Sequence, residues 1–179
     1  MTYVFLADGF EEIEALSVVD ILRRCKLEVR TVSIMDRPLV TGSHGIPVTA
    51  DCLLADICPD DADALVLPGG LPGADFLQAS QPLGALLKAA DAEGKIVAAI
   101  CAAPKVLGAL GLTKNRRATC YPGCEGALTG AVFCTDRVVR DGNLITSRGA
   151  GTAADFAFAL AEALGSDPSL VRSGMLFDI

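Results

Sequence analysis

IVAAICAAPKVLG, residues 96–108, joins a short apolar run to an alanine-rich stretch at Cys101. Apolar runs such as residues 96–100 are typical of parallel strands that are buried on both faces. Residues 102–110 favour a helix, and Pro104 falls in its first turn, where the missing N–H group breaks no hydrogen bond. Cys101 is therefore predicted at a strand-to-helix corner. This is the position of a nucleophile elbow, at the sheet edge where ligands bind in open α/β folds.

The thiol of Cys101 has two interpretations. The N-terminus of a helix offers unpaired N–H groups and partial positive charge, which favour a reactive thiolate over a thiol. Cysteine is also among the most buried residue types, and most buried cysteines are inert. The strand–cysteine–helix context favours the reactive interpretation.

The composition predicts one domain, residues 1–179, with a sizeable core. Hydrophobic residues make up 51% and aromatic residues 5%, so aliphatic side chains and alanine fill the interior. The net charge of −7 argues against binding to nucleic acid. No apolar stretch is long enough for a membrane span, and the first residues, MTYVFLAD, do not resemble a secretory signal. We therefore expect a cytoplasmic protein whose seven cysteines are reduced.

The first helix is predicted to carry an unusual carboxylate. Asp8 is a candidate N-cap, Glu11 lies three residues later as in a capping box, and the helix continues to about Arg24. Glu14 shares a face with apolar positions of this helix, which include Phe10, Ile13, Val18 and Ile21. A carboxylate on a core-facing stripe is costly unless it is paired or protonated, which marks Glu14 as a candidate functional residue. The alternative is a Glu14 that leans to the rim and stays wet.

Strand and helix patterns alternate along the rest of the chain. We predict strands at 2–7, 27–34, 63–67, 117–121, 131–135, 138–140 and 144–146, a turn followed by a short strand within 43–49, and helices at 82–92 and 152–164. This alternation predicts an α/β fold, a three-layer sandwich with a mostly parallel sheet.

The loop PGGLPG, residues 68–73, follows one of these strands. Glycines after a strand let backbone N–H groups approach a ligand closely, although a plain turn needs no ligand. The loop matches neither the Walker phosphate loop nor the dinucleotide-binding pattern. Cys120 and Cys124 lack the further ligands of a zinc site, so we expect no metal and no cofactor.

Four separated segments carry a family resemblance that spans nearly the whole chain. They are ADGFEEIE at 7–14, LPGG at 67–70, AICA at 99–102 and TSRG at 146–149. With them the chain resembles the ThiJ/PfpI superfamily, and within it the parkinsonism-associated protein deglycase subfamily. The resemblance implies a flavodoxin-like fold of the class I glutamine amidotransferase type, a homodimer and a cysteine nucleophile.

The resemblance also assigns roles to residues at matching positions. Cys101 would be the nucleophile, and Glu14 would hydrogen-bond its sulfur, best in a protonated form that lowers the pKa of the thiol. Gly70 and Ala102 would lend backbone N–H groups to an oxyanion site. Arg148 and Gly149, in the last matching segment, are further candidates for the pocket.

One position departs from the family pattern. The subfamily often has a histidine where TCYP, residues 119–122, places Tyr121. Tyr121 either hydrogen-bonds a substrate oxygen or closes the pocket wall. The only histidine, His44, is predicted in a turn away from the elbow, so we expect no Cys–His dyad and no protease activity of that type.

The leading hypothesis is a cysteine-dependent enzyme of the glyoxalase or protein deglycase type. Its substrates would be methylglyoxal, glyoxal or early glycation adducts on proteins, attacked by Cys101 while Glu14 moves a proton. The alternative is an oxidative-stress sensor or chaperone, because an activated thiol beside a carboxylate oxidises readily. A role in thiazole monophosphate biosynthesis rests only on older naming of bacterial family members. The residues alone leave open whether the protein is an enzyme.

Overall fold

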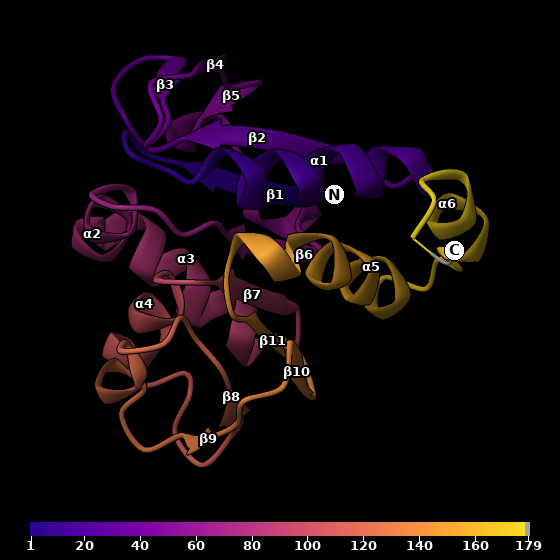
Figure 1. Cartoon of the computed structure of the whole chain (residues 1–179). Coiled ribbons are helices and arrows are strands. Elements are labelled where there is room, and N and C mark those ends of the chain that lie inside the picture. Colours follow the sequence, from indigo (N-terminus) through magenta and orange to yellow (C-terminus); the bar gives the residue numbers. More distant parts are fainter. Residues whose placement is uncertain (178–179) are drawn as a thin grey trace.

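Short apolar segments form the centre of a seven-stranded sheet in the computed structural model, which describes residues 1–177 (Figure 1). The β10–β11 pair is antiparallel and the other neighbouring strands of this sheet run parallel. The prediction of a mostly parallel sheet is thus confirmed. Across the sheet, the strands are β10 (Val138–Asp141), β11 (Leu144–Ser147), β7 (Ile96–Ile100), β6 (Ala64–Leu67), β1 (Thr2–Leu6), β2 (Val29–Ser33) and β5 (Cys52–Leu53).

Helices cover both faces of the sheet and make the molecule a three-layer sandwich (Figure 1). One face packs against α1 (Glu12–Arg24) and α5 (Ala153–Ala163), and the other against α2 (Gly73–Ala79), α3 (Gln81–Ala92) and α4 (Pro104–Ala109). Successive side chains of a strand point to opposite faces of the sheet. In β1, Tyr3 and Phe5 therefore pack in the apolar core on one face, and Val4 and Leu6 pack in the core on the other face. None of the helices within residues 1–177 combines the length and apolar composition that a membrane span requires.

Smaller elements flank the sandwich. A hairpin of β3 (Leu39–Thr41) and β4 (Pro47–Thr49) stands near the start of α1, and β8 (Arg117–Ala118) pairs in parallel with β9 (Val132–Phe133). The helix α6 (Ser169–Gly174) follows α5. The 3₁₀ turns are η1 (Leu54–Asp56), η2 (Pro59–Asp61), η3 (Glu125–Ala127) and η4 (Ala150–Thr152). The short elements β3, β5, α2 and α6 lie outside the predicted ranges.

The start of α1 differs from the prediction in two details. Glu11, not Asp8, caps the helix, and its side chain accepts a hydrogen bond from the N–H of Glu14. Asp8 instead accepts a hydrogen bond from the N–H of Thr41 and forms an ion pair with Arg37. Its carboxylate oxygens are thus bound by a segment that is remote in sequence. Ile13, predicted on the apolar face, is exposed.

Candidate active site at Cys101

Cys101 lies in a tight turn between β7 and α4 and has a backbone φ of +65°. A cysteine in this left-handed region costs about 1–3 kcal/mol and persists only when its surroundings fix it. Two hydrogen bonds fix it here, because the N–H of Cys101 donates to Ser147 O at 3.0 Å and its C=O accepts from the N–H of Tyr121 at 2.8 Å. The predicted elbow is present, and backbone from β11 and from the segment after β8 holds it.

Glu14 enters the site from the first turn of α1. Its side chain is 1% exposed, as the helical pattern predicted, and its carboxyl group lies beside the thiol of Cys101, where each group shifts the pKa of the other. Oε2 of Glu14 accepts a hydrogen bond from the N–H of Gly69 at 2.8 Å. Within residues 1–177, Oε1 of the same group is buried and has no hydrogen-bond partner. One carboxyl oxygen is therefore anchored and the other is available to a bound molecule.

The electrostatics of this pair favour a shared proton. Burial raises the pKa of Glu14 to about 7, and the charge of Glu11 acts in the same direction. Burial also raises the pKa of Cys101 to about 12, and the charged form of Glu14 adds to this, while the N–H groups of Ala102 and Gly70 lower it. The thiol pKa beside a charged Glu14 is thus raised, not lowered as the helix position suggested. Protonation of Glu14 removes that repulsion and gives the sulfur a hydrogen-bond donor.

Backbone amides converge on the sulfur of Cys101. The N–H groups of Gly70 and Ala102, both expected at the site, lie close enough to the sulfur to lower its pKa. Such donors also stabilise the oxygen of a carbonyl group that the sulfur attacks. Gly70 has a φ of +89°, and a Cβ there would lie 2.4 Å from the backbone nitrogen of Glu11, so only glycine fits.

The outer wall brings together Tyr121 and Gly149. A Cβ on Gly149 would lie 3.3 Å from Cδ2 of Tyr121 and 4.0 Å from Oε1 of Glu14, which places Gly149 between the ring and the carboxyl group. Tyr121 is 52% exposed, so its hydroxyl-bearing ring is accessible to a ligand. Arg148 is half-buried, with an Nη1 that has no hydrogen-bond partner in the described part of the chain. Burial raises the pKa of Cys120 to about 12, and the charge of Arg148 partly opposes this rise.

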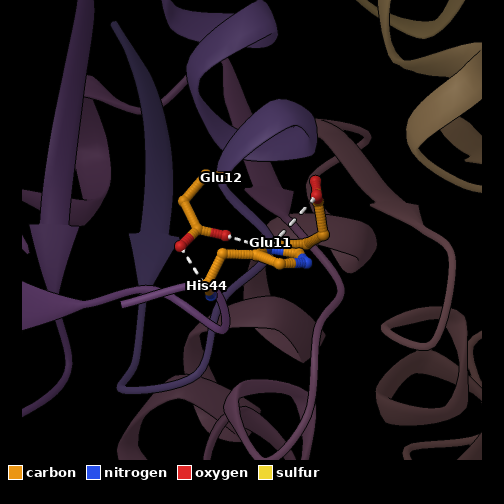
Figure 2. A group of neighbouring side chains, drawn as sticks. All are labelled: Glu11, Glu12 and His44. Carbon is orange, nitrogen blue, oxygen red and sulfur yellow. Dashed lines mark hydrogen bonds and ion pairs between the residues drawn. The ribbon is translucent and has the colours of Figure 1, made fainter. Parts of the chain in front are cut away.

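His44 lies beside the start of α1, in contact with Glu12. Its backbone N–H and its Nδ1 each lie 2.8 Å from the carboxylate of Glu12, whose chain neighbour Glu11 also faces the ring (Figure 2). Burial alone would raise the pKa of Glu12, but the hydrogen bonds from His44 lower it to about 2. His44 thus pairs with Glu12 and not with Cys101, in line with the expected lack of a Cys–His dyad.

Two supporting groups escaped the sequence analysis. Gly69 supplies the N–H for Glu14, and Ser147 supplies the carbonyl for Cys101. Gly69 lies in the glycine loop at residues 68–73, so the sequence carried a signal for its position. The role of Ser147 depends on the pairing of β11 with β7, which no local pattern reveals.

The arrangement suits the addition of a thiol to a carbonyl group. A nucleophilic sulfur, a carboxyl group able to carry a proton near neutral pH, and two N–H donors lie at the carboxyl ends of β1, β6 and β7. These are the parts that nucleophilic and acid–base catalysis require. Strand order reverses in this region of the sheet, where α/β proteins bind ligands.

Comparisons with known proteins agree with the fold. Residues 2–163 match the model of the DJ-1/PfpI family. The chain is 39% identical over 174 residues to Protein DJ-1 homolog B of Arabidopsis thaliana, covering 96% of this chain but 40% of that protein. It is 35% identical over 147 residues to a deglycase of Pyrococcus abyssi, covering 81% of this chain and 87% of that protein.

A solved structure described as Toxoplasma gondii DJ-1, oxidized, superposes with a TM-score of 0.94 at 35% identity. The superposition covers 99% of this chain and 98% of that one. The family match, the archaeal relative and this structure all extend over most of the chain, so the flavodoxin-like fold expected from the sequence is confirmed. The chain belongs to the DJ-1/PfpI family.

Proposed function

We propose that the protein is a cysteine-dependent enzyme of the deglycase or glyoxalase type, acting on methylglyoxal, glyoxal or early glycation adducts of proteins. The observation that carries the proposal is the half-buried Cys101 beside the buried Glu14, with the N–H groups of Gly70 and Ala102 lowering the pKa of the thiol. The similarity to an archaeal protein named as a deglycase supports the substrate class.

The proposed reaction begins when the sulfur of Cys101 adds to the aldehyde carbon of methylglyoxal. The thiol proton passes to the aldehyde oxygen, and the N–H groups of Gly70 and Ala102 stabilise this oxygen while charge develops on it. The product is a hemithioacetal in which the former aldehyde carbon carries one hydrogen, one hydroxyl group and the sulfur.

Glu14 then transfers a proton between neighbouring carbons. As a carboxylate it removes the hydrogen from the sulfur-bearing carbon, which gives an enediolate, and it returns this proton to the adjacent carbon, while the hydroxyl proton on the sulfur-bearing carbon passes to the oxygen of the adjacent carbon. The former aldehyde carbon becomes a thioester carbonyl, with no net oxidation or reduction. Water hydrolyses the thioester, releases lactate and restores the thiol of Cys101. A pKa of about 7 suits Glu14 to both halves of this transfer near neutral pH.

The test is lactate formation from methylglyoxal under reducing, metal-free conditions. We expect turnover by the wild type and by Cys58→Ser, which alters an exposed cysteine, and none by Cys101→Ser. Methylglyoxal consumption without lactate would indicate simple thiol adducts and would contradict the proposal. Equal turnover by Cys101→Ser would remove Cys101 from the mechanism.

A second candidate function is an oxidation sensor at Cys101. The unpartnered Oε1 of Glu14 supports it, because a protonated carboxyl group there could donate a hydrogen bond to a sulfinate oxygen. The test is peptide mass spectrometry after mild peroxide treatment. Oxidation of Cys101 well ahead of Cys25 and Cys58 would favour the sensor, and equal rates at the three thiols would contradict it.

The proposal includes a homodimer, as the family resemblance implies, and a cytoplasmic location, as the N-terminal sequence and the cysteine content suggest. Light scattering during gel filtration tests the assembly across a range of protein concentrations. A mass near twice 18.5 kDa is expected, whereas an 18.5 kDa species throughout would contradict the dimer.

A further inference from the structure

A second cluster of chemically capable side chains lies at the start of α1, apart from Cys101. Glu11, Glu12 and His44 each offer one ligand atom, and these three atoms lie within 4.8 Å of one another (Figure 2). Nδ1 of His44 is 2.8 Å from Oε2 of Glu12 and 4.0 Å from Oε1 of Glu11. We propose that Glu11, Glu12 and His44 form a binding site for a divalent transition-metal ion of the zinc class. The proposal is independent of the enzymatic activity proposed above.

The distances from His44 to the two carboxylates are close to those between ligands of one metal ion. Metal–ligand distances of about 2.0–2.2 Å separate two ligands of the same ion by roughly 3–4 Å. The Glu12–His44 distance is slightly below this range, and the Glu11–His44 distance is at its upper end. An ion can therefore replace the hydrogen bond between Glu12 and His44 with a side-chain adjustment of under about 1 Å.

Backbone groups orient both carboxylates toward the histidine. Oε2 of Glu11 accepts from the N–H of Glu14 at 2.7 Å, which leaves its Oε1 facing His44. Oε1 of Glu12 accepts from the N–H of His44 at 2.8 Å, which leaves its Oε2 facing the ring. Ligands fixed by such outer contacts lose little freedom when they bind a metal ion.

The Glu12 carboxylate occupies a space that the fold reserves for it. A Cβ on Gly42 would lie 2.2 Å from Oε1 and 2.3 Å from Cδ of Glu12, so the hairpin leaves room for this carboxylate only because residue 42 is glycine. Glu12 is 5% exposed, whereas the side chain of His44 is 70% exposed. The buried carboxylate is held in place, and the exposed imidazole leaves a path for an ion from solvent.

Charge and ligand type select the class of ion. Two carboxylates outweigh one imidazole even when the ring is protonated, so the cluster is anionic. The partial positive charge at the start of α1, about half a unit, offsets only part of this excess. Mixed nitrogen and oxygen ligands suit Zn²⁺, Co²⁺, Ni²⁺, Mn²⁺ or Fe²⁺, whereas Ca²⁺ and Mg²⁺ prefer oxygen alone and Cu⁺ prefers sulfur.

Cobalt(II) is the probe that distinguishes this cluster from the thiols, because sulfur ligands give an intense charge-transfer band and nitrogen or oxygen ligands do not. We expect the metal-free protein to bind one Co²⁺, with weak visible bands, no charge-transfer band and displacement by Zn²⁺. Cys101→Ser should bind equally well. His44→Ala and Glu11→Gln should weaken binding about tenfold or more.

Asp20→Asn is the matched control, since Asp20 is an exposed carboxylate on the same helix, and its binding should equal that of the wild type. Circular dichroism checks the fold of each variant, and His44→Ala changes an exposed side chain that should not affect it. Three outcomes would overturn the proposal. They are no saturable Co²⁺ binding, binding that survives in His44→Ala, and a charge-transfer band that disappears in Cys101→Ser.

Discussion

The N–H of Gly69 donates a hydrogen bond to Oε2 of Glu14 at 2.8 Å, and the missing side chain of Gly69 is what lets the carboxyl group approach Cys101. A Cβ at residue 69 would lie 2.6 Å from that oxygen and 2.7 Å from Cβ of Cys101. Both distances are shorter than the contacts that real Cβ atoms make. The Glu14–Cys101 pair therefore needs glycine at residue 69 for lack of space, and not because of an unusual backbone φ.

Gly69→Ala is therefore expected to separate Glu14 from Cys101. Overpacking of this kind costs about 1–3 kcal/mol, and turnover should fall by at least the same factor as in a Glu14 variant. Urea denaturation and lactate formation measure the two effects. Gly126→Ala is the control, because a Cβ there meets nothing within 4 Å. Wild-type turnover by Gly69→Ala would show that the close approach is not needed.

Glu14→Gln separates proton transfer from nucleophilicity. The amide keeps the shape of the carboxyl group and a donor for the sulfur, but it cannot carry a proton. We expect lactate formation to fall by about 10²- to 10⁴-fold, the usual contribution of a general acid–base group. Alkylation of Cys101 by iodoacetamide should persist. Parallel loss of alkylation and turnover would mean that Glu14 acts only on the reactivity of the thiol.

The raised pKa of Glu14 predicts a pH-dependent loss of stability. Between the ordinary value of 4.5 and about 7, the unfolded chain releases this proton while the folded chain retains it. Folding stability therefore falls as the pH rises through this window, by about 3 kcal/mol in total. Glu14→Gln lacks this term, so its stability relative to the wild type should grow from about pH 4 to about pH 8. Urea denaturation in the presence of EDTA measures the difference, and a constant difference would contradict the raised pKa.

Arg116 is predicted to stabilise the edge of the sheet without affecting the thiol. Its guanidinium group contacts Asp91 at 2.8 Å, the carbonyl oxygen of Asp141 at 2.6 Å and the side-chain oxygen of Asn143 at 2.7 Å. Lysine cannot reproduce this fork, so Arg116→Lys should lower the free energy of unfolding by about 1–3 kcal/mol.

The alkylation rate of Cys101 should not change in Arg116→Lys, because the fork ties α3 to the β10–β11 turn and not to the elbow. Arg140→Lys is the control, since the exposed guanidinium group of Arg140 donates one long hydrogen bond, of 3.3 Å, to Gly142 O within residues 1–177. Unchanged stability of Arg116→Lys in urea would show that the fork contributes nothing.

The sequence predicted the parts of the site that depend on local patterns. The apolar run before Cys101 predicts a buried strand that ends at this residue. The helical spacing of Glu14 from the apolar residues of the first helix predicts that its carboxylate faces the core. The contacts that complete the site come from elsewhere in the chain. Ser147 reaches Cys101 through the pairing of β11 with β7, which depends on the order of strands in the finished sheet.

The errors have the same origin. Asp8 has the sequence signature of a helix cap, but the N–H of Thr41 and the guanidinium of Arg37 take its oxygens when the β3–β4 hairpin folds over the start of α1. The same hairpin brings His44 to Glu12, a contact between residues separated by 32 positions. Such placements are decided by tertiary packing, which local propensity does not encode.

The backbone on either side of the sulfur is hydrogen-bonded to two other segments, through Ser147 and Tyr121. Chemistry at the thiol therefore leaves the main chain where it is. A change at Cys101, whether an adduct or an oxidised sulfur, will not travel through the sheet as a change of shape. A molecule that distinguishes the modified from the unmodified protein therefore has to contact the side chain of Cys101 directly.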